Sequence, residues 1–276
     1  MNRLLIKKQA KASLKGKWGK SIAVCFLAGL LTAIIPGIFS GIGTMFSTTE
    51  KVDGVEKVTS TTPVGLIFFI IAFIAIIIVG PLFEYARVKV FLKNNRGEDF
   101  TVGNLFDGFK DSPAKNILTA IVRYCAIWLC YFIPAFIGGI FLGIAGGSAR
   151  GISRVTSIFN AEDKAKEFIA SVGPLILIAF IFFVAAIVIG IIATFMYQLV
   201  FYVRVDNPDM GIIQILKTSR KILHGRKIDF FVLQFTFIGW VILSVITFGI
   251  GFLWLVPYIE ASTAAFYDAA KDNIIE

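Results

Sequence analysis

The chain has 276 residues, of which 57% are hydrophobic and 16% are charged, and its mean hydropathy is +0.82. Soluble domains carry about a quarter charged residues, so this composition predicts an integral membrane protein and excludes intrinsic disorder, collagen and a small secreted disulfide scaffold. The net charge of +9 is compatible with nucleic acid, anionic lipid or membrane topology, depending on where the basic residues lie.

Six apolar stretches are candidates for membrane spans. A hydrocarbon core about 30 Å thick requires roughly 20 apolar residues in an α-helix, and the sixth stretch is the shortest. In chain order the stretches are residues 21–46, 64–83, 117–145, 174–203, 230–248 and 252–267. The polar–apolar alternation of a membrane barrel is absent. The sequence therefore predicts an all-α membrane protein with six transmembrane helices and additional cytoplasmic amphipathic helices.

The distribution of charge predicts the orientation. The amino terminus, the second and fourth connections and the tail together hold 20 basic and 11 acidic residues, whereas the other two connections hold six of each. Because Lys and Arg are retained on the cytoplasmic side, we expect both termini in the cytoplasm of a cell-membrane protein. The last two stretches need a very short turn at residues 248–251. A re-entrant pair or a single long helix is the alternative there.

Two basic segments between or before the spans are predicted to form amphipathic helices. In the first, four lysines fall on one side of a helix, and in the second, Asn207 and Pro208 resemble a helix start and are followed by apolar residues at helical spacing. We expect these helices to lie on the inner membrane face with the apolar side down, or to pack on the bundle as ordinary helices. The basic residues expected to contact lipid or a partner are Lys7, Lys8, Lys11, Lys15, Lys217, Arg220 and Lys221.

A threefold organisation is also predicted. A glycine with nearby basic residues precedes the outward span three times, at Gly16, Gly108 and Gly225. The chain is therefore interpreted as one integral membrane domain, residues 1–276, built from three units of a cytoplasmic helix followed by a hairpin. The units would be residues 1–97, 98–205 and 206–276.

Arg123 and Glu260 are the two charged residues deep within the predicted spans. Both lie roughly 10 Å from the cytoplasmic ends of their spans, at a rise of 1.5 Å per residue. Because intramembrane charges are costly and commonly paired, we predict an Arg123–Glu260 pair. The alternative is that Arg123 extends toward the surface and that Glu260 is protonated or caps a break near Pro257.

The residues that carry enzyme chemistry are sparse. His224 is the sole histidine, and Cys25, Cys125 and Cys130 lie inside predicted spans without metal-ligand spacing. A nucleophile elbow and a phosphate loop are both absent from the sequence. We therefore expect no catalytic residue, no cofactor and no metal, and the three cysteines are interpreted as buried apolar residues.

Several segments resemble one bacterial integral membrane family, the domain of unknown function nine-seven-five, found mostly in Firmicutes. The resemblance rests on residues 5–20, on residues 104–110 and above all on residues 216–227, with further matches at 237–240, 247–251, 257–258 and 265–267. The resemblance covers nearly the whole chain. It implies membership of a family that has no assigned activity. It therefore supplies no catalytic residue.

Two functions follow as expectations. The first is a non-enzymatic envelope accessory or scaffold that contacts anionic membrane lipid, a protein partner or a second copy of the chain. The alternative is a small transporter or lipid-handling protein with a polar pathway near Arg123 and Glu260. Nucleic acid is excluded as a partner because the basic residues are spread over membrane-proximal segments.

Overall fold

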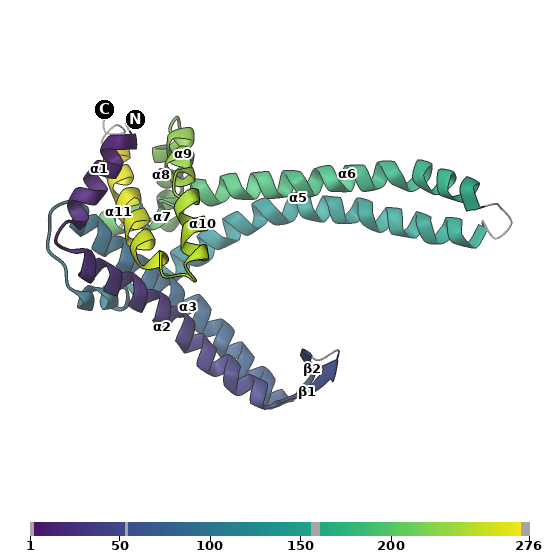
Figure 1. Cartoon of the computed structure of the whole chain (residues 1–276), viewed down its shortest axis with the longest axis horizontal. Coiled ribbons are helices and arrows are strands. Elements are labelled where there is room, and N and C mark those ends of the chain that lie inside the picture. Colours follow the sequence, from purple (N-terminus) through teal and green to yellow (C-terminus); the bar gives the residue numbers. More distant parts are fainter. Residues whose placement is uncertain (1–2, 53–54, 156–160, 272–276) are drawn as a thin grey trace. The chain divides into compact units, whose positions relative to one another are not determined.

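The computed structural model describes residues 3–52, 55–155 and 161–271, and nearly all of them are helical (Figure 1). The chain divides into two compact units, one formed by Met1–Ile121 with Gln198–Glu276 and the other by Val122–Tyr197. Within the described residues, five helical segments are long and apolar enough to cross a membrane. They are Trp18–Met45, Pro63–Asn95, Pro113–Gly147, Val172–Asp206 and Lys227–Ile246. The predicted helical class is confirmed, with five helices capable of spanning a membrane, while the predicted count of six spans stays a prediction.

The first unit begins with the predicted amino-terminal helix, α1 (Arg3–Leu14). Its buried residues Ile6, Ala10 and Leu14 recur every four positions and form one stripe. The helix packs along α11 (Phe252–Lys271), the last helix of the chain. Protein, rather than lipid, therefore covers the apolar stripe of α1.

Helices α2 (Trp18–Met45) and α3 (Pro63–Asn95) form a long antiparallel hairpin. α3 starts where the Thr62 side chain accepts a hydrogen bond from the Gly65 N–H (3.2 Å) and Pro63 occupies the first turn. The tip of the hairpin carries two short antiparallel strands, β1 (Ser47–Val52) and β2 (Val55–Thr61) (Figure 1). The all-α prediction did not include these strands.

α3 continues for twelve residues beyond the predicted span end at residue 83. The extension is buried on most sides, and it packs against a 3₁₀ helix, η1 (Val102–Phe106), and the short α4 (Asp107–Lys110). Lys89 anchors α4 to α3 through Asp107 (2.8 Å) and Asp111 (2.5 Å). The core where these elements meet α2 consists of Val24, Ala28, Val79, Phe83, Ala86, Val90, Phe100 and Leu105.

The second unit is formed by α5 (Pro113–Val155), from Val122 onward, and α6 (Ala161–Met196). Val172, Ala179, Ala186 and Ala193 of α6 are all buried and recur every seven residues. Small side chains that recur every seven residues on one helix permit close packing against a neighbouring helix. The predicted connection at residues 146–173 is largely helical, because α5 and α6 continue through its charged positions, and residues 156–160 lie outside the described residues.

The first unit resumes with α7 (Val200–Asp206) and α8 (Ile212–Leu223). The predicted start of α8 at Asn207 is wrong, because the Asn207 side-chain amide donates to the Val203 carbonyl (3.1 Å) and so caps the end of α7. α8 begins four residues after Pro208, with Gly211 at its amino-terminal cap.

The chain then forms α9 (Lys227–Phe235), α10 (Ile238–Ile246) and α11. The predicted short turn between α10 and α11 is confirmed. Phe248 and Gly249 both have positive φ there, at 52° and 87°. This left-handed geometry suits glycine and is uncommon for phenylalanine.

Candidate functional site

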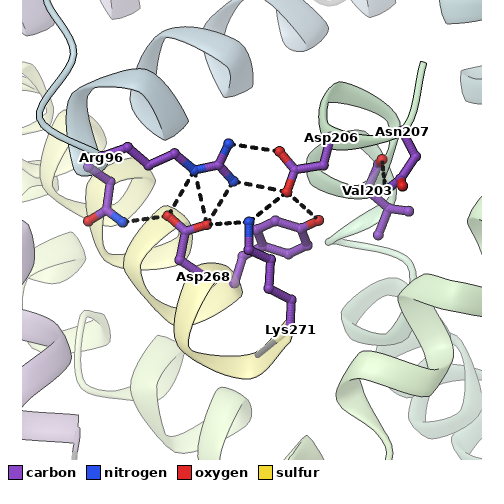
Figure 2. Close-up of polar contacts among 8 residues, drawn as sticks. Arg96, Val203, Asp206, Asn207, Asp268 and Lys271 are labelled. Carbon is purple, nitrogen blue, oxygen red and sulfur yellow. Dashed lines mark hydrogen bonds and ion pairs between the residues drawn. The ribbon is translucent and has the colours of Figure 1, made fainter. Parts of the chain in front are cut away.

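The carboxyl-terminal ends of α3, α7 and α11 meet in one ion-pair network (Figure 2). Arg96, directly after α3, binds Asp206 through both terminal guanidinium nitrogens, Nη1 and Nη2 (2.8 and 2.9 Å), and binds Asp268 through Nη2 (2.7 Å). Lys271 bridges the same two carboxylates, at 2.8 Å from Asp206 and 3.1 Å from Asp268. Each carboxylate therefore has two cationic partners, and each cation links two helices.

Two neutral side chains complete the network. The Tyr267 hydroxyl donates to Asp206 (3.1 Å), and the Asn95 amide donates to Asp268 (2.7 Å). The side chains of both aspartates are 16% exposed. Two-pronged Arg–carboxylate bonds combine strength with a fixed geometry, so the network holds the three helix ends in register.

The four charges of the network balance, with two cations facing two anions. Burial by itself would lower the pKa of Arg96, but its hydrogen bonds to Asp206 and Asp268 and their negative charges outweigh burial and raise that pKa above its ordinary value. Arg96 and Lys271 also lie at helix carboxyl termini, where the helix dipole favours positive charge. The guanidinium therefore stays charged at every physiological pH.

The same three helices form a second polar layer farther along their length. Arg87 of α3 pairs with Glu260 of α11 (3.0 Å), and the Tyr202 hydroxyl of α7 donates to Glu260 (3.3 Å). Arg87 precedes Arg96 by nine residues, or about 13 Å of helix, and Glu260 precedes Asp268 by eight. Two polar layers thus connect α3, α7 and α11.

Glu260 was a predicted site residue, whereas its observed partner Arg87 was not. Arg87 was assigned to a connecting segment because the second span was ended at residue 83, whereas α3 carries it on a continuous helix. Arg123 lies in the second unit, is 6% exposed and stacks over the Tyr124 ring at 4.7 Å. The predicted Arg123–Glu260 pair stays a prediction.

The predicted basic residues of α1 fall into two groups. Lys8, Lys11 and Lys15 are exposed, and Lys7 is half-buried. The Lys7 ammonium lies over the Phe237 ring (4.8 Å), and the Lys11 ammonium lies near the Tyr258 ring (5.7 Å). Burial, and then the charge of Lys11, lower the pKa of Lys7 below its ordinary value.

The three predicted basic residues of α8 are all exposed, whereas Ile215, Leu216, Ile222 and Leu223 are buried and Ile213 is exposed. α8 packs on α7 and α11 through Ile215, Ile222 and Leu223. The buried side of α8 is therefore covered by protein, as in the alternative of a helix packed on the bundle, and the contact of α8 with the inner membrane face stays a prediction. The basic residues left on the outer surface are Lys217, Arg220 and Lys221.

The turns that precede α2 and α9 have the same geometry. Gly16 and Gly225 adopt φ of 77° and 78°. The next residues, Lys17 and Arg226, have φ/ψ of −119°/10° and −123°/9°. The positive φ explains why glycine is found at both positions.

The basic residue after each of these glycines also makes an equivalent contact. Lys17 donates to the carbonyl of Glu98, just beyond α3 (3.0 Å), and Arg226 donates to the carbonyl of Ala269 in α11 (3.2 Å). Gly108, the third predicted match, lies inside α4 without a positive φ. The first and third predicted units therefore share one entry turn, and the division into three units stays a prediction.

A cavity of about 310 Å³ lies between α2 and α11. It is lined by apolar and small residues, without a charged side chain. The lining residues are Ile22, Cys25, Phe26, Gly29, Leu30, Phe252, Leu253 and Val256. The polar pathway of the transporter alternative gains no support from this cavity.

Among the described residues, no group of three or more His, Cys, Asp or Glu side chains is placed to hold a metal ion. The three cysteines carry free thiols. All three were predicted to be buried, but Cys25 and Cys130 are half-buried and Cys125 is exposed on the helix surface.

Comparison with protein-family models gives one match, described as a protein of unknown function (DUF975), over residues 1–273. The chain belongs to this family. The resemblance seen in the sequence is thereby confirmed for nearly its whole length. Searches of the curated proteins and of the solved structures found no match to this DUF975 chain.

Proposed function

We propose that this DUF975 protein is a non-enzymatic, multi-pass protein of the cell membrane with both termini in the cytoplasm, where it acts as an envelope accessory or scaffold. Its basic cytoplasmic residues would contact anionic membrane lipid. The single observation that carries the proposal is the arrangement of α8. Its apolar side is occupied by the protein itself, so Lys217, Arg220 and Lys221 remain exposed.

The ion-pair network supports a scaffold role. Arg96, Asp206, Asp268 and Lys271 fix the ends of α3, α7 and α11, and α8 packs directly on α7 and α11. The basic residues of α8 therefore lie on a helix that is packed against α7 and α11, which the ion pairs hold together. Each Lys or Arg near an anionic leaflet contributes about 1 kcal/mol of binding free energy.

Replacing Lys217, Arg220 and Lys221 together with Gln is expected to weaken the preference for anionic lipid. The loss of about 3 kcal/mol corresponds to a roughly hundredfold lower relative affinity for phosphatidylglycerol over phosphatidylcholine. The measurement is lipid exchange into the purified, reconstituted protein, with the ratio of bound lipids read by mass spectrometry.

The matched control removes three basic residues from the connection predicted on the other side, Arg154, Lys164 and Lys166. This variant is expected to keep the wild-type lipid ratio. An unchanged lipid ratio in the α8 variant would contradict the proposal, and so would an equal loss in the control.

A further inference from the structure

The hairpin formed by α10 and α11 ends far short of the hairpin formed by α2 and α3, beside which it lies. Phe252 and Leu253, at the start of α11, line a cavity with Gly29 and Leu30 of α2. From Leu30, α2 continues for fifteen residues to Met45, which is about 22 Å of helix. Figure 1 shows α2 and α3 running well past the turn between α10 and α11.

The same difference in length appears when both hairpins are measured from the Arg87–Glu260 pair. Glu260 is held beside Arg87 of α3. From Arg87, α3 runs back twenty-four residues to Pro63, or about 36 Å, whereas α11 runs back only eight residues from Glu260 to Phe252, or about 12 Å. A hydrocarbon core is about 30 Å thick. The α2–α3 hairpin is therefore long enough to cross it, and α11 reaches less than half as far.

The tip of the short hairpin has the composition of a segment that stays in hydrocarbon. Residues 230–259 contain no charged side chain. Phe248 is 98% exposed, and Ile246 and Ile250 beside it are also exposed. The α2–α3 tip, by contrast, contains Glu50, Lys51, Asp53, Glu56 and Lys57.

The backbone N–H groups of the tip are also paired without water. The N–H groups of residues 247–255 all donate within the segment, and the Gly251 N–H uses the Thr247 hydroxyl (3.2 Å). Inside a bilayer each unsatisfied backbone group costs several kcal/mol, so irregular backbone is tolerated there only when its groups are paired. A turn in water has no such requirement.

We propose that the α10–α11 hairpin is a half-depth membrane insertion. It enters and leaves the bilayer on the side that carries the termini, and its exposed tip, centred on Phe248, contacts the acyl chains of that leaflet near the bilayer midplane. The chain then crosses the membrane four times, through α2, α3, α5 and α6, rather than six. The segment Lys227–Ile246 is long enough to cross, but its first part, α9, lies beside Phe266 and Thr263, on the terminal side of Glu260. This selects the re-entrant alternative left open by the sequence and does not depend on the lipid contacts of α8.

Spin labelling in reconstituted bilayers tests the depth. In a variant whose native cysteines are replaced by serine, a nitroxide is attached at Phe248→Cys, and its collision rates with oxygen and with a water-soluble nickel chelate are measured. The expected result is high oxygen and low nickel accessibility, equal to that of a label at Ile34→Cys, an exposed position near the middle of α2. A label at Thr61→Cys, at the end of β2, supplies the aqueous reference.

Nickel accessibility at Phe248→Cys as high as at Thr61→Cys would overturn the proposal. The tip would then lie in water, on one side of the membrane or the other. Should the Phe248→Cys protein fail to fold, the Ile250→Cys variant tests the same point, since Ile250 is 60% exposed. A nickel value midway between the two references would also overturn it, because the tip would then lie near a headgroup region.

Discussion

Replacing Gly108 with alanine is expected to separate α4 from α3 and to lower the free energy of unfolding by at least about 2 kcal/mol. An added Cβ would lie 2.7 Å from the carbonyl carbon of Leu82, 3.1 Å from its Cα and closer still to its oxygen. These are backbone atoms of a buried helix, so no side-chain rotation relieves the overlap. The measurement is equilibrium unfolding of the purified protein in mild detergent.

Gly103→Ala is the matched control, five residues earlier in η1. The nearest atom to its added Cβ is the Thr101 hydroxyl at 3.6 Å, an ordinary van der Waals distance. This variant is expected to unfold within about 0.5 kcal/mol of the wild type. Equal stability of the Gly103→Ala and Gly108→Ala variants would contradict the packing of α4 against Leu82.

Replacing Arg96 with methionine is expected to lower the free energy of unfolding by about 3 kcal/mol, because it leaves Asp206 and Asp268 together with Lys271 as their remaining cation. Arg96→Lys keeps the charge but not the planar fork that binds two carboxylates at once, so an intermediate loss is expected. Equilibrium unfolding in mild detergent checks both variants.

The double variant Arg96→Met with Asp206→Asn separates the network from general effects of each substitution. Its loss is expected to be smaller than the sum of the two single losses by at least about 1 kcal/mol, because the second substitution removes an anion that the first has left underpaired. Arg220→Met, which removes an exposed charge from α8, is the control and is expected to change stability by less than about 0.5 kcal/mol. Strict additivity would show that Arg96 and Asp206 do not interact.

The sequence predicted the membrane class and most helices because hydrophobic period and length depend on local composition. The apolar spacing of Ile215, Ile222 and Leu223 located α8 correctly. Its start was misplaced because Asn207 and Pro208 suit a helix start in isolation, and only the fold shows Asn207 bonded to α7. The continuation of α3 past residue 83 was missed because hydropathy marks where a membrane ends, not where a helix ends.

The ion-pair network could not be predicted from one sequence. Arg96 is 110 residues from Asp206 and 172 residues from Asp268, and many other charged residues compete at comparable separations. Glu260 was recognised as unusual because it interrupts an apolar stretch. Its partner Arg87 gave no such signal, since it lies in a segment rich in charges.

The proposed function requires the basic surface of α8 to face the cytoplasm. The most direct measurement is labelling of Lys217→Cys, in a background lacking the native cysteines, with a maleimide that does not cross membranes. No labelling is expected in intact cells, and full labelling is expected in inverted membrane vesicles. Labelling of Lys217→Cys in intact cells would contradict both the orientation and the proposed contact with the inner leaflet.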